Sequence, residues 1–221
     1  MDLKEIERRC EEVLRRVPPH VTVLAAGKGR SPEELLAAIR TGIRDIGENY
    51  VQEAEAKRGA IEEPVTWHMI GRLQRNKARR ALAVFDWLQT LDSLALAQRL
   101  ERLLAEANRT LPVLVQVNIG REPQKAGVLP EALPDFVRKL AELPHLEVRG
   151  LMAIPPAPKE PEDSRPHFRA MRKLFEALKA EAIPRVRMEV LSMGMSADWD
   201  VAVEEGATMI RLGTLLFGPR A

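Results

Sequence analysis

Short apolar runs alternate with amphipathic stretches along almost the whole chain. Several runs are near-continuous and rich in β-branched residues, as in VLVQVNI at 113–119 and TMIRLGTLLF at 208–217, which is typical of strands buried on both faces. RDIGEN at 44–49 is the weakest run. The predicted strands are Val21–Ala26, Asp45–Gly47, Val65–Ile70, Val84–Leu91, Pro112–Ile119, Leu146–Ile154, Val186–Met193 and Thr208–Phe217.

The stretches between these runs have the spacing of amphipathic helices. SPEELLAAIRTG at 31–42 is the clearest. Ser31 and Glu34 can form a capping box there, and Pro32 suits the first helical position. A charged helix is also expected ahead of the first strand. Leucines or other apolar residues recur at helical spacing in three later stretches, at 93–108, 130–143 and 168–182.

Strands and helices that alternate in this way predict a parallel sheet with helical crossovers. Their number within 221 residues favours a closed (β/α)8 TIM barrel, with an open doubly wound sheet as the alternative. We expect one domain over 1–221, with the extra helix at about 2–16 and the barrel at about 21–219. The Pro-rich stretch at 154–166 is too short to separate domains and is expected to be a long loop after the sixth strand.

Composition and charge argue against several classes of protein. Charged residues make up 30% of the chain, but the formal net charge is +2 and there is no basic tail, so neither nucleic acid nor a membrane surface is an expected partner. The charged N-terminus lacks the apolar segment of a secretory signal, and no window approaches a membrane span of about 20 apolar residues. We therefore expect a cytoplasmic protein. We also expect a monomer, because no long exposed apolar helix face stands out.

Metal and disulfide chemistry are not expected. The single cysteine, Cys10, cannot form an internal disulfide, and the four histidines are scattered without the spacing of zinc ligands. The candidate chemistry therefore lies in amines, guanidinium groups and backbone N–H groups at the strand ends.

Lys28 follows the run VTVLAAG at the expected C-terminal end of the first strand, where barrels build their functional sites. An amine that loses its proton through partial burial can attack a carbonyl there. Gly27 and Gly29 flank it and allow a ligand or backbone to approach closely. The alternative is a solvated lysine at a strand end, and this segment alone does not decide between the two.

Two segments rich in glycine and hydroxyl groups end the seventh and eighth strands, LSMGMSADWD at 191–200 and IRLGTLLFG at 210–218. Barrels often bind phosphate in the loops after these strands, and N–H groups near a helix start can bind an anion. A helix is expected to begin at Ser196 or Asp198. Ordinary turn chemistry is the alternative. The candidate anion-binding residues are Ser192, Gly194, Ser196, Gly213 and Thr214.

Three other polar residues interrupt or follow apolar runs. Arg211 lies within the eighth strand, where its charge needs a partner, either a carboxylate elsewhere in the barrel or a ligand in the mouth. Asn49 follows the second strand and either faces the site or caps the next helix. His68 is expected to be a hydrogen-bonded core histidine.

Taken together, six segments resemble the pyridoxal phosphate homeostasis proteins, a family related to the N-terminal barrel of alanine racemase. They occur in the family's order, on a chain of the family's length, and the resemblance runs almost from end to end. The segments are GENYVQE (47–53), WHMIGRLQRNK (67–77), VLVQVNIG (113–120), GLMAIP (150–155), LSMGMS (191–196) and IRLGTLLFG (210–218).

The resemblance implies that Lys28 forms a Schiff base with pyridoxal 5′-phosphate (PLP), and that Arg211 faces the pyridine nitrogen. Relatives commonly have serine where this chain has Gly27, which is expected to loosen the local backbone but leaves the amine in place. No catalytic residue and no metal are implied. The remaining cofactor-binding residues that the resemblance implies are Asn49 and, around the phosphate, Ser192, Gly213 and Thr214.

The expected function is reversible binding of PLP in its intracellular homeostasis, as a carrier or buffer without sustained turnover. PLP-dependent apoenzymes or free amino acids are the expected acceptors. Lys125, in the loop after the fifth strand, is a candidate relay amine, with a surface role as the alternative. Turnover is not expected because the chain stops at Ala221, without the second domain that completes the site in related racemases.

Two other functions stay open at this point. One is a PLP-dependent amino-acid racemase, which chiral analysis of single-enantiomer amino acids would identify. The other is a lysine Schiff-base aldolase for sugar phosphates, which would lack the visible absorbance of PLP. Both use the same barrel, so the fold does not choose between them.

Overall fold

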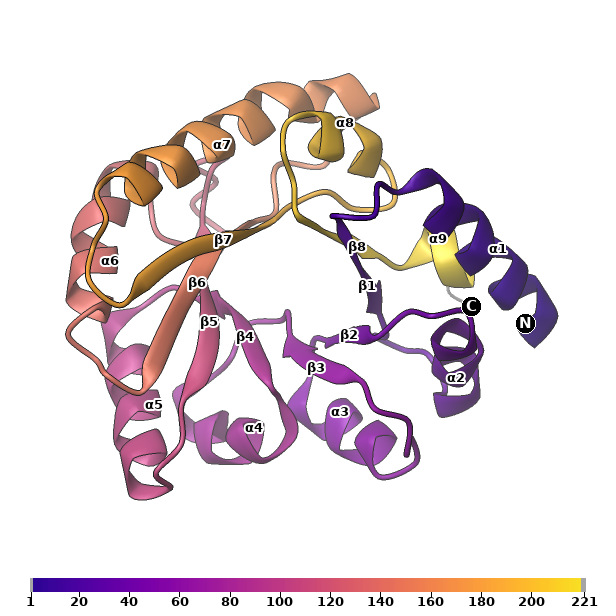
Figure 1. Ribbon diagram of the computed structural model, residues 1–221, viewed down its shortest axis with the longest axis horizontal. Coiled ribbons are helices and arrows are strands. Elements are labelled where there is room, and N and C mark those ends of the chain that lie inside the picture. Colours follow the sequence, from indigo (N-terminus) through magenta and orange to yellow (C-terminus); the bar gives the residue numbers. More distant parts are fainter. Residues whose placement is uncertain (1, 220–221) are drawn as a thin grey trace.

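Eight parallel strands pair in chain order, and the eighth pairs with the first to close a barrel that helices surround (Figure 1). The computed structural model describes residues 2–219. The predicted (β/α)8 barrel is confirmed, and the open-sheet alternative is wrong, because β8 runs beside β1 from Thr22↔Met209 to Ala25↔Leu212. The strands are β1 (Thr22–Ala26), β2 (Asp45–Glu48), β3 (Thr66–Met69), β4 (Trp87–Leu91), β5 (Leu111–Val117), β6 (Leu146–Ala153), β7 (Val186–Ser192) and β8 (Met209–Leu212).

The helices lie outside the strands, and α1, ahead of the barrel, packs beside α2 and α9 (Figure 1). In the described part of the chain, no helix is long and apolar enough to span a membrane. The α-helices are α1 (Leu3–Arg16), α2 (Pro32–Arg40), α3 (Val51–Arg58), α4 (Ala78–Val84), α5 (Leu94–Glu106), α6 (Leu133–Leu140), α7 (Arg165–Ala180), α8 (Trp199–Glu204) and α9 (Thr214–Phe217); short 3-10 turns are η1 (Arg75–Lys77), η2 (Pro130–Ala132) and η3 (Pro161–Ser164).

The predicted helix ends agree with the structure where capping chemistry is explicit. The Glu34 N–H donates to Ser31 Oγ at 3.3 Å, and the Ser31 N–H donates to Glu34 Oε2 at 2.8 Å, so the capping box at α2 is confirmed. The helix after β7 has Asp198 as its N-cap, one of the two expected starts. Tyr50, not Asn49, is the N-cap of α3, so the alternative that Asn49 caps this helix is wrong.

Two apolar runs were predicted as strands over too great a length. The run at 208–217 ends as a strand at Leu212 and continues after Gly213 as α9. The run at 84–91 begins with the last residue of α4, and β4 starts only at Trp87. Periodicity cannot separate a buried strand from a short buried helix within one apolar run, and both errors follow from that ambiguity.

The residues of β1 show that the core has two parts. Val23 and Ala25 belong to a large apolar cluster shared with the helices, whereas Leu24 clusters with Ile70 and Met209. Because successive side chains of a strand point to opposite faces, the large cluster lies between the barrel and its helices, and the small one lies inside the barrel. The small interior cluster leaves other inward positions to polar side chains.

At Gly150 in β6, the backbone of the neighbouring strand approaches too closely for a side chain. A Cβ at this position would lie 1.8 Å from the Val190 carbonyl oxygen of β7, and φ is +151°. We expect Gly150→Ala to lower the free energy of unfolding by about 2 kcal/mol or more, because the two strands must separate. Urea denaturation measures the change. Gly59→Ala is the control, since its Cβ meets nothing closer than 3.7 Å; equal losses in both variants would contradict the prediction.

Candidate functional site

Lys28 lies at the C-terminal mouth of the barrel, just after β1. Gly27 continues the ladder one residue past the strand, with its N–H donating to the Gly47 carbonyl at 2.8 Å. The Lys28 side chain is partly exposed, and its Nζ lies 5.2 Å from the centre of the Tyr50 ring. The amine is therefore at the end of the barrel where it was predicted, within reach of a small molecule.

A buried lysine on α3 fixes the backbone on both sides of Lys28. Lys57 Nζ donates to the Gly27 carbonyl at 2.7 Å. It also lies 3.4 Å from Glu53 Oε2, which accepts a hydrogen bond from the Gly29 N–H at 3.1 Å. Because the peptide groups before and after Lys28 are bonded to this pair of charges, the direction in which the amine leaves the backbone is set by α3.

Glu48, at the end of β2, is the main counter-charge of Lys57, with Oε1 2.7 Å from Nζ. Its side chain is fully buried, and within residues 2–219 its Oε2 has no hydrogen-bond partner. Burial raises the pKa of Glu48, and the Lys57 ammonium opposes that increase. A Cβ on Gly27 would lie 2.4 Å from Oε1. Glycine at position 27 therefore makes room for this carboxylate, and the flanking hydrogen bonds hold the backbone that was expected to be loose.

Arg211 points into the barrel interior, on the same face of β8 as Met209. Its Nη1 donates to Ser192 Oγ at 2.8 Å, and its Nη2 donates to the Ala153 carbonyl at 2.9 Å. Both partners are neutral, so an ion pair with a carboxylate, one of the two alternatives from the sequence, is not found among the described residues. Burial lowers the pKa of Arg211 to about 10, which leaves the guanidinium charged at neutral pH.

Hydrogen bonds continue from Ser192 across the barrel. Its hydroxyl donates to Gln89 Oε1 at 2.8 Å, Gln89 Nε2 lies 3.0 Å from His68 Nδ1, and His68 Nε2 lies 2.8 Å from Asp45 Oδ1. His68 is 1% exposed, and Gln89 and Ser192 are fully buried. The prediction of a hydrogen-bonded core histidine is confirmed. Gln89 and Asp45 were missed, although a glutamine in the middle of WLQTL is a polar residue at a position where the run is otherwise apolar.

The start of α9 presents N–H groups at the same mouth. Ser196 Oγ accepts hydrogen bonds from the Gly213 and Leu215 N–H groups, both at 3.2 Å, and Thr214 between them is exposed. A hydroxyl beside backbone N–H groups is suited to an anion such as phosphate. The structure brings Ser196, Gly213 and Thr214 together, while Ser192 lies deeper, in the chain of hydrogen bonds that crosses the interior.

Arg30 connects the turn that carries Lys28 to the end of α9. Its guanidinium donates to the Gly218 carbonyl and lies 5.5 Å from the centre of the Phe217 ring. The Arg30 side chain is 7% exposed, so this contact is buried. This contact therefore joins the turn that carries the amine to the helix whose start carries the N–H groups.

The loop between β7 and α8, which carries Ser196, is held by a buried carboxylate. Asp198 Oδ1 accepts a hydrogen bond from the Met195 N–H at 2.8 Å, and its Oδ2 accepts one from the Ser164 hydroxyl at 2.7 Å. Asp198 and Ser164 are each 1% exposed. The loop is therefore anchored to the end of η3, on the neighbouring crossover.

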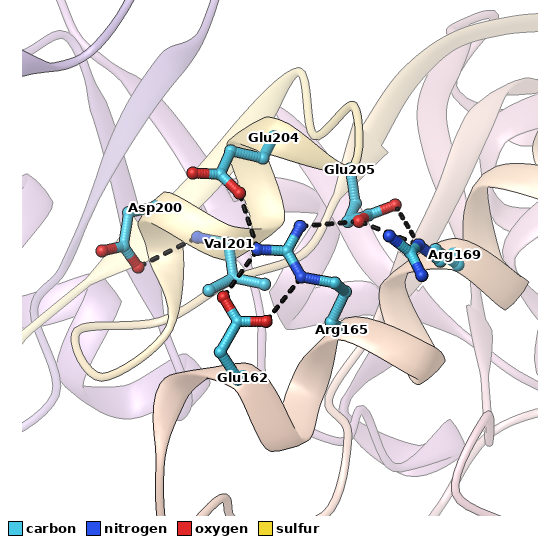
Figure 2. A network of polar contacts seen from close by, with 7 residues as sticks. All are labelled: Glu162, Arg165, Arg169, Asp200, Val201, Glu204 and Glu205. Atoms are coloured by element: carbon cyan, nitrogen blue, oxygen red, sulfur yellow. Dashed lines mark hydrogen bonds and ion pairs between the residues drawn. The ribbon is translucent and has the colours of Figure 1, made fainter.

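A more exposed set of ion pairs joins the same two crossovers (Figure 2). Arg165, at the start of α7, donates to Glu204 and Glu205 at the end of α8, both at 2.7 Å, and to Glu162 at 2.6 Å. Arg169 adds a second contact to Glu205 at 3.0 Å. The hydrogen bond from Arg165 lowers the pKa of Glu205. These contacts fix α8, and with it the loop that precedes it.

Asn49 and Lys125, the other two candidates, follow β2 and β5 at the mouth. Lys125 Nζ donates to the Pro155 carbonyl at 3.0 Å and lies 2.5 Å from Glu122 Oε2, so its loop is tied to the one after β6. The hydrogen bonds of the described residues do not join either side chain to Lys28. Within the same residues, no group of three or more His, Cys, Asp or Glu side chains is placed to hold a metal ion.

Glu48 makes the stability of the mouth depend on pH. Folding raises the pKa of Glu48, so its contribution to stability is present below the unfolded pKa and is lost as pH rises through the folded pKa. We expect the free energy of unfolding of the wild type, minus that of Glu48→Gln, to fall as the pH rises above about 4, the ordinary pKa of a glutamate side chain. Urea denaturation at a series of pH values measures it, with exposed Glu62→Gln as the control. A difference that rises with pH would contradict the prediction.

The whole chain is similar to known proteins. Residues 1–221 match the family model described as the N-terminal domain of alanine racemase. A pyridoxal phosphate homeostasis protein of Aquifex aeolicus is 41% identical over 219 residues, which cover 99% of this chain and 95% of that protein. A pyridoxal phosphate homeostasis protein of Haemophilus influenzae is 40% identical over 220 residues, which cover 98% of this chain and 92% of that protein.

Solved structures agree with these matches. PipY of Synechococcus elongatus, solved with PLP bound, is 39% identical and superposes with a TM-score of 0.89 over 96% of this chain and 100% of that chain. Alanine racemase of Corynebacterium glutamicum is 18% identical, with a TM-score of 0.76 over 99% of this chain and 61% of that chain, and shares the fold. The chain therefore belongs to the pyridoxal phosphate homeostasis protein family, whose barrel is that of the alanine racemase N-terminal domain.

Proposed function

We propose that the chain binds PLP through a Schiff base on Lys28 and serves PLP homeostasis as a reversible carrier. The observation that carries the proposal is the meeting, at one barrel mouth, of an amine, a charged guanidinium and a cluster of N–H groups, on Lys28, Arg211 and the start of α9. These suit the three functional groups of PLP: the amine suits the aldehyde, the guanidinium the ring nitrogen, and the N–H groups the phosphate. The PLP bound in the structure of a relative of 39% identity supports the same assignment.

Arg211 bears on the chemistry of the site but does not decide it alone, since racemases of this barrel type also have a ring-facing arginine. Bound PLP supplies an electron sink for carbanions, and a protonated ring nitrogen strengthens it. Arg211 only donates hydrogen bonds and keeps its proton at neutral pH, since even its lowered pKa is about 10. A ring nitrogen facing this guanidinium accepts a hydrogen bond and stays unprotonated. Carbanion chemistry on bound amino acids is therefore disfavoured, and the choice between carrier and racemase rests on the rest of the site.

We assign the phosphate to the start of α9. Within residues 2–219 the Thr214 N–H makes no backbone hydrogen bond, and the Ser196 hydroxyl, which accepts from the Gly213 and Leu215 N–H groups, keeps its own proton to donate; these are the donors that an anion would meet there. Ser192, assigned to the phosphate from the resemblance, serves the cofactor instead by accepting a hydrogen bond from the ring-facing guanidinium. Asn49, at the end of β2, remains a proposed cofactor contact.

An open mouth supports a carrier over a racemase. Tyr50, the only tyrosine of the chain, is 48% exposed, and its ring lies beside the Lys28 amine. Such a site lacks the exclusion of water that strengthens electrostatic catalysis. Release requires only amine exchange: a neutral acceptor amine would form the C=N bond as the bond to Lys28 breaks, and the two protons lost by the acceptor nitrogen would pass to the leaving Lys28 amine. We propose that the protein acts in the cytoplasm as a monomer. Its proposed acceptors are free amino acids and lysines of PLP-dependent apoenzymes.

Replacing the lysine tests the covalent link. Wild-type protein incubated with PLP should show a visible absorbance band that borohydride removes, and mass spectrometry should then locate the reduced adduct on Lys28. Lys28→Ala should lose the band, because the amine that forms the imine is removed. Lys159→Ala, an exposed lysine in the loop after β6, is the control and should retain it.

Two outcomes would contradict the proposal. An unchanged band in Lys28→Ala, or an adduct on another lysine, would remove Lys28 from the site. Steady loss of optical purity in single-enantiomer amino acids, dependent on Lys28, would identify a racemase in place of a carrier.

Lys125 is proposed as a relay amine during transfer. Its Nζ is held by Pro155 and Glu122, so it presents a second amine at the mouth. We expect Lys125→Ala to retain PLP and to pass it to a PLP-requiring apoenzyme several-fold more slowly, as measured by recovery of that enzyme's activity. Lys159→Ala is again the control, and transfer by Lys125→Ala at the wild-type rate would remove this role.

A further inference from the structure

We propose that Asp45, His68 and Gln89 are positioning residues for Arg211. Together they fix which group donates and which accepts in each hydrogen bond of the series that ends at the Arg211 guanidinium. The inference rests on the proposed function in one respect, that Arg211 faces the ring nitrogen of PLP. None of the three residues needs to touch the cofactor. Their effect reaches it through Ser192 and the guanidinium.

The geometry places these groups in one continuous line from β2 to β8. Three contacts of 2.8, 3.0 and 2.8 Å join Asp45 to His68, His68 to Gln89, and Gln89 to Ser192, and a fourth of 2.8 Å reaches Arg211. The strands β2, β3, β4, β7 and β8 each contribute one inward-facing polar side chain to it. The line therefore crosses the barrel interior beside the small apolar cluster.

The donors and acceptors along this line can be assigned by elimination. An ionised carboxylate only accepts, so His68 Nε2 carries the proton that is donated to Asp45. The other nitrogen of a neutral imidazole then accepts, so the Gln89 amide nitrogen faces it. The Gln89 oxygen is left to accept from the Ser192 hydroxyl, and the Ser192 lone pairs are left for Arg211.

A separate contact supports the same orientation of the amide. Gln89 Nε2 also lies 3.1 Å from Met209 Sδ, a weak acceptor that suits the second N–H of the amide. The His68 ring is stacked on Trp87 at 5.6 Å between ring centres, which holds the imidazole plane. Neither Gln89 nor His68 can turn over without losing these contacts.

Burial makes the direction costly to change. His68, Gln89, Ser192 and Arg211 are between 0% and 5% exposed, whereas the Asp45 side chain is 24% exposed. When a buried group loses its hydrogen-bond partner, its desolvation is left uncompensated and the full free-energy cost is incurred, because water cannot replace the partner. The carboxylate at the water-accessible end of the line therefore determines how the guanidinium is held at the other end.

The test uses the protein both without and with PLP. In the protein without PLP, long-range proton–nitrogen NMR should show His68 protonated at Nε2 and not at Nδ1, with its signals identified by their loss in His68→Gln. The Arg211 guanidinium should give resolved, slowly exchanging N–H signals, identified by their loss in Arg211→Lys. Gln89→Leu, which removes the acceptor of Ser192 at similar volume, should broaden these signals.

With PLP added, Gln89→Leu should weaken retention of the cofactor about tenfold and shift the pH at which the visible band titrates. Thr90→Val is the matched control, because Thr90 is the next residue of β4, is 3% exposed and donates a buried hydrogen bond to the Gly71 carbonyl at 2.7 Å. It should lose stability without changing the His68 tautomer, the Arg211 signals or the band. Asp45→Asn, at the partly exposed end, serves if Gln89→Leu fails to fold, and should give a mixture of His68 tautomers.

The inference is overturned if His68 carries its proton on Nδ1, or if Gln89→Leu and Thr90→Val affect the Arg211 signals alike. A wild type that binds no PLP would remove the proposed function, while the NMR experiments without PLP would still decide whether the three residues hold Arg211.

Discussion

The interior of this barrel depends on one constraint, a buried guanidinium that makes no ion-pair contact with a carboxylate of residues 2–219. Arg211 cannot discard its charge at neutral pH, so it requires strong and fully oriented neutral acceptors. The Ala153 carbonyl belongs to the backbone at the end of β6 and is fixed there, but the Ser192 hydroxyl has to be oriented by its own partners. The polar line across the barrel follows from this requirement, and it explains why so few apolar side chains occupy the interior.

At the mouth, residues on the two faces of the sheet fix different groups. Inward-facing residues hold Arg211, whereas charges on the helical side hold the backbone that carries Lys28. Glu48 and Lys57 lie between β2 and α3, and they act on the peptide groups around the amine without entering the interior. This separation allows the position of the amine and that of the guanidinium to be set by independent groups of residues.

Much of the fold was predictable because its signals are local. The capping box at Ser31 and the near-continuous apolar run of β5 are read directly from the sequence. The end of β8 was not, because an apolar run has no feature that marks where a strand stops and α9 begins. The position of Lys28 at the mouth followed from the end of β1, and the family resemblance pointed to Arg211.

The supporting residues were much harder to predict. Gln89 and Ser192 are 103 residues apart along the chain, and no local spacing relates two side chains that meet only after the barrel closes. Glu48 was read as part of a family motif, and its burial against Gly27 depends on the packing of α3. Ser192 is the last residue of β7 and Ser196 lies in the loop that follows, and only the alternation along β7 shows that the Ser192 side chain turns inward.

Arg30 has a mechanical consequence for any molecule held at both ends. Its hydrogen bond to the Gly218 carbonyl joins the turn after Lys28 to the far end of α9, so this contact resists displacement of one relative to the other. A force on the anionic group of such a molecule would therefore also act on the backbone next to Lys28. If PLP is bound as proposed, strain at its phosphate and strain at its imine would rise and fall together, which would ease its release.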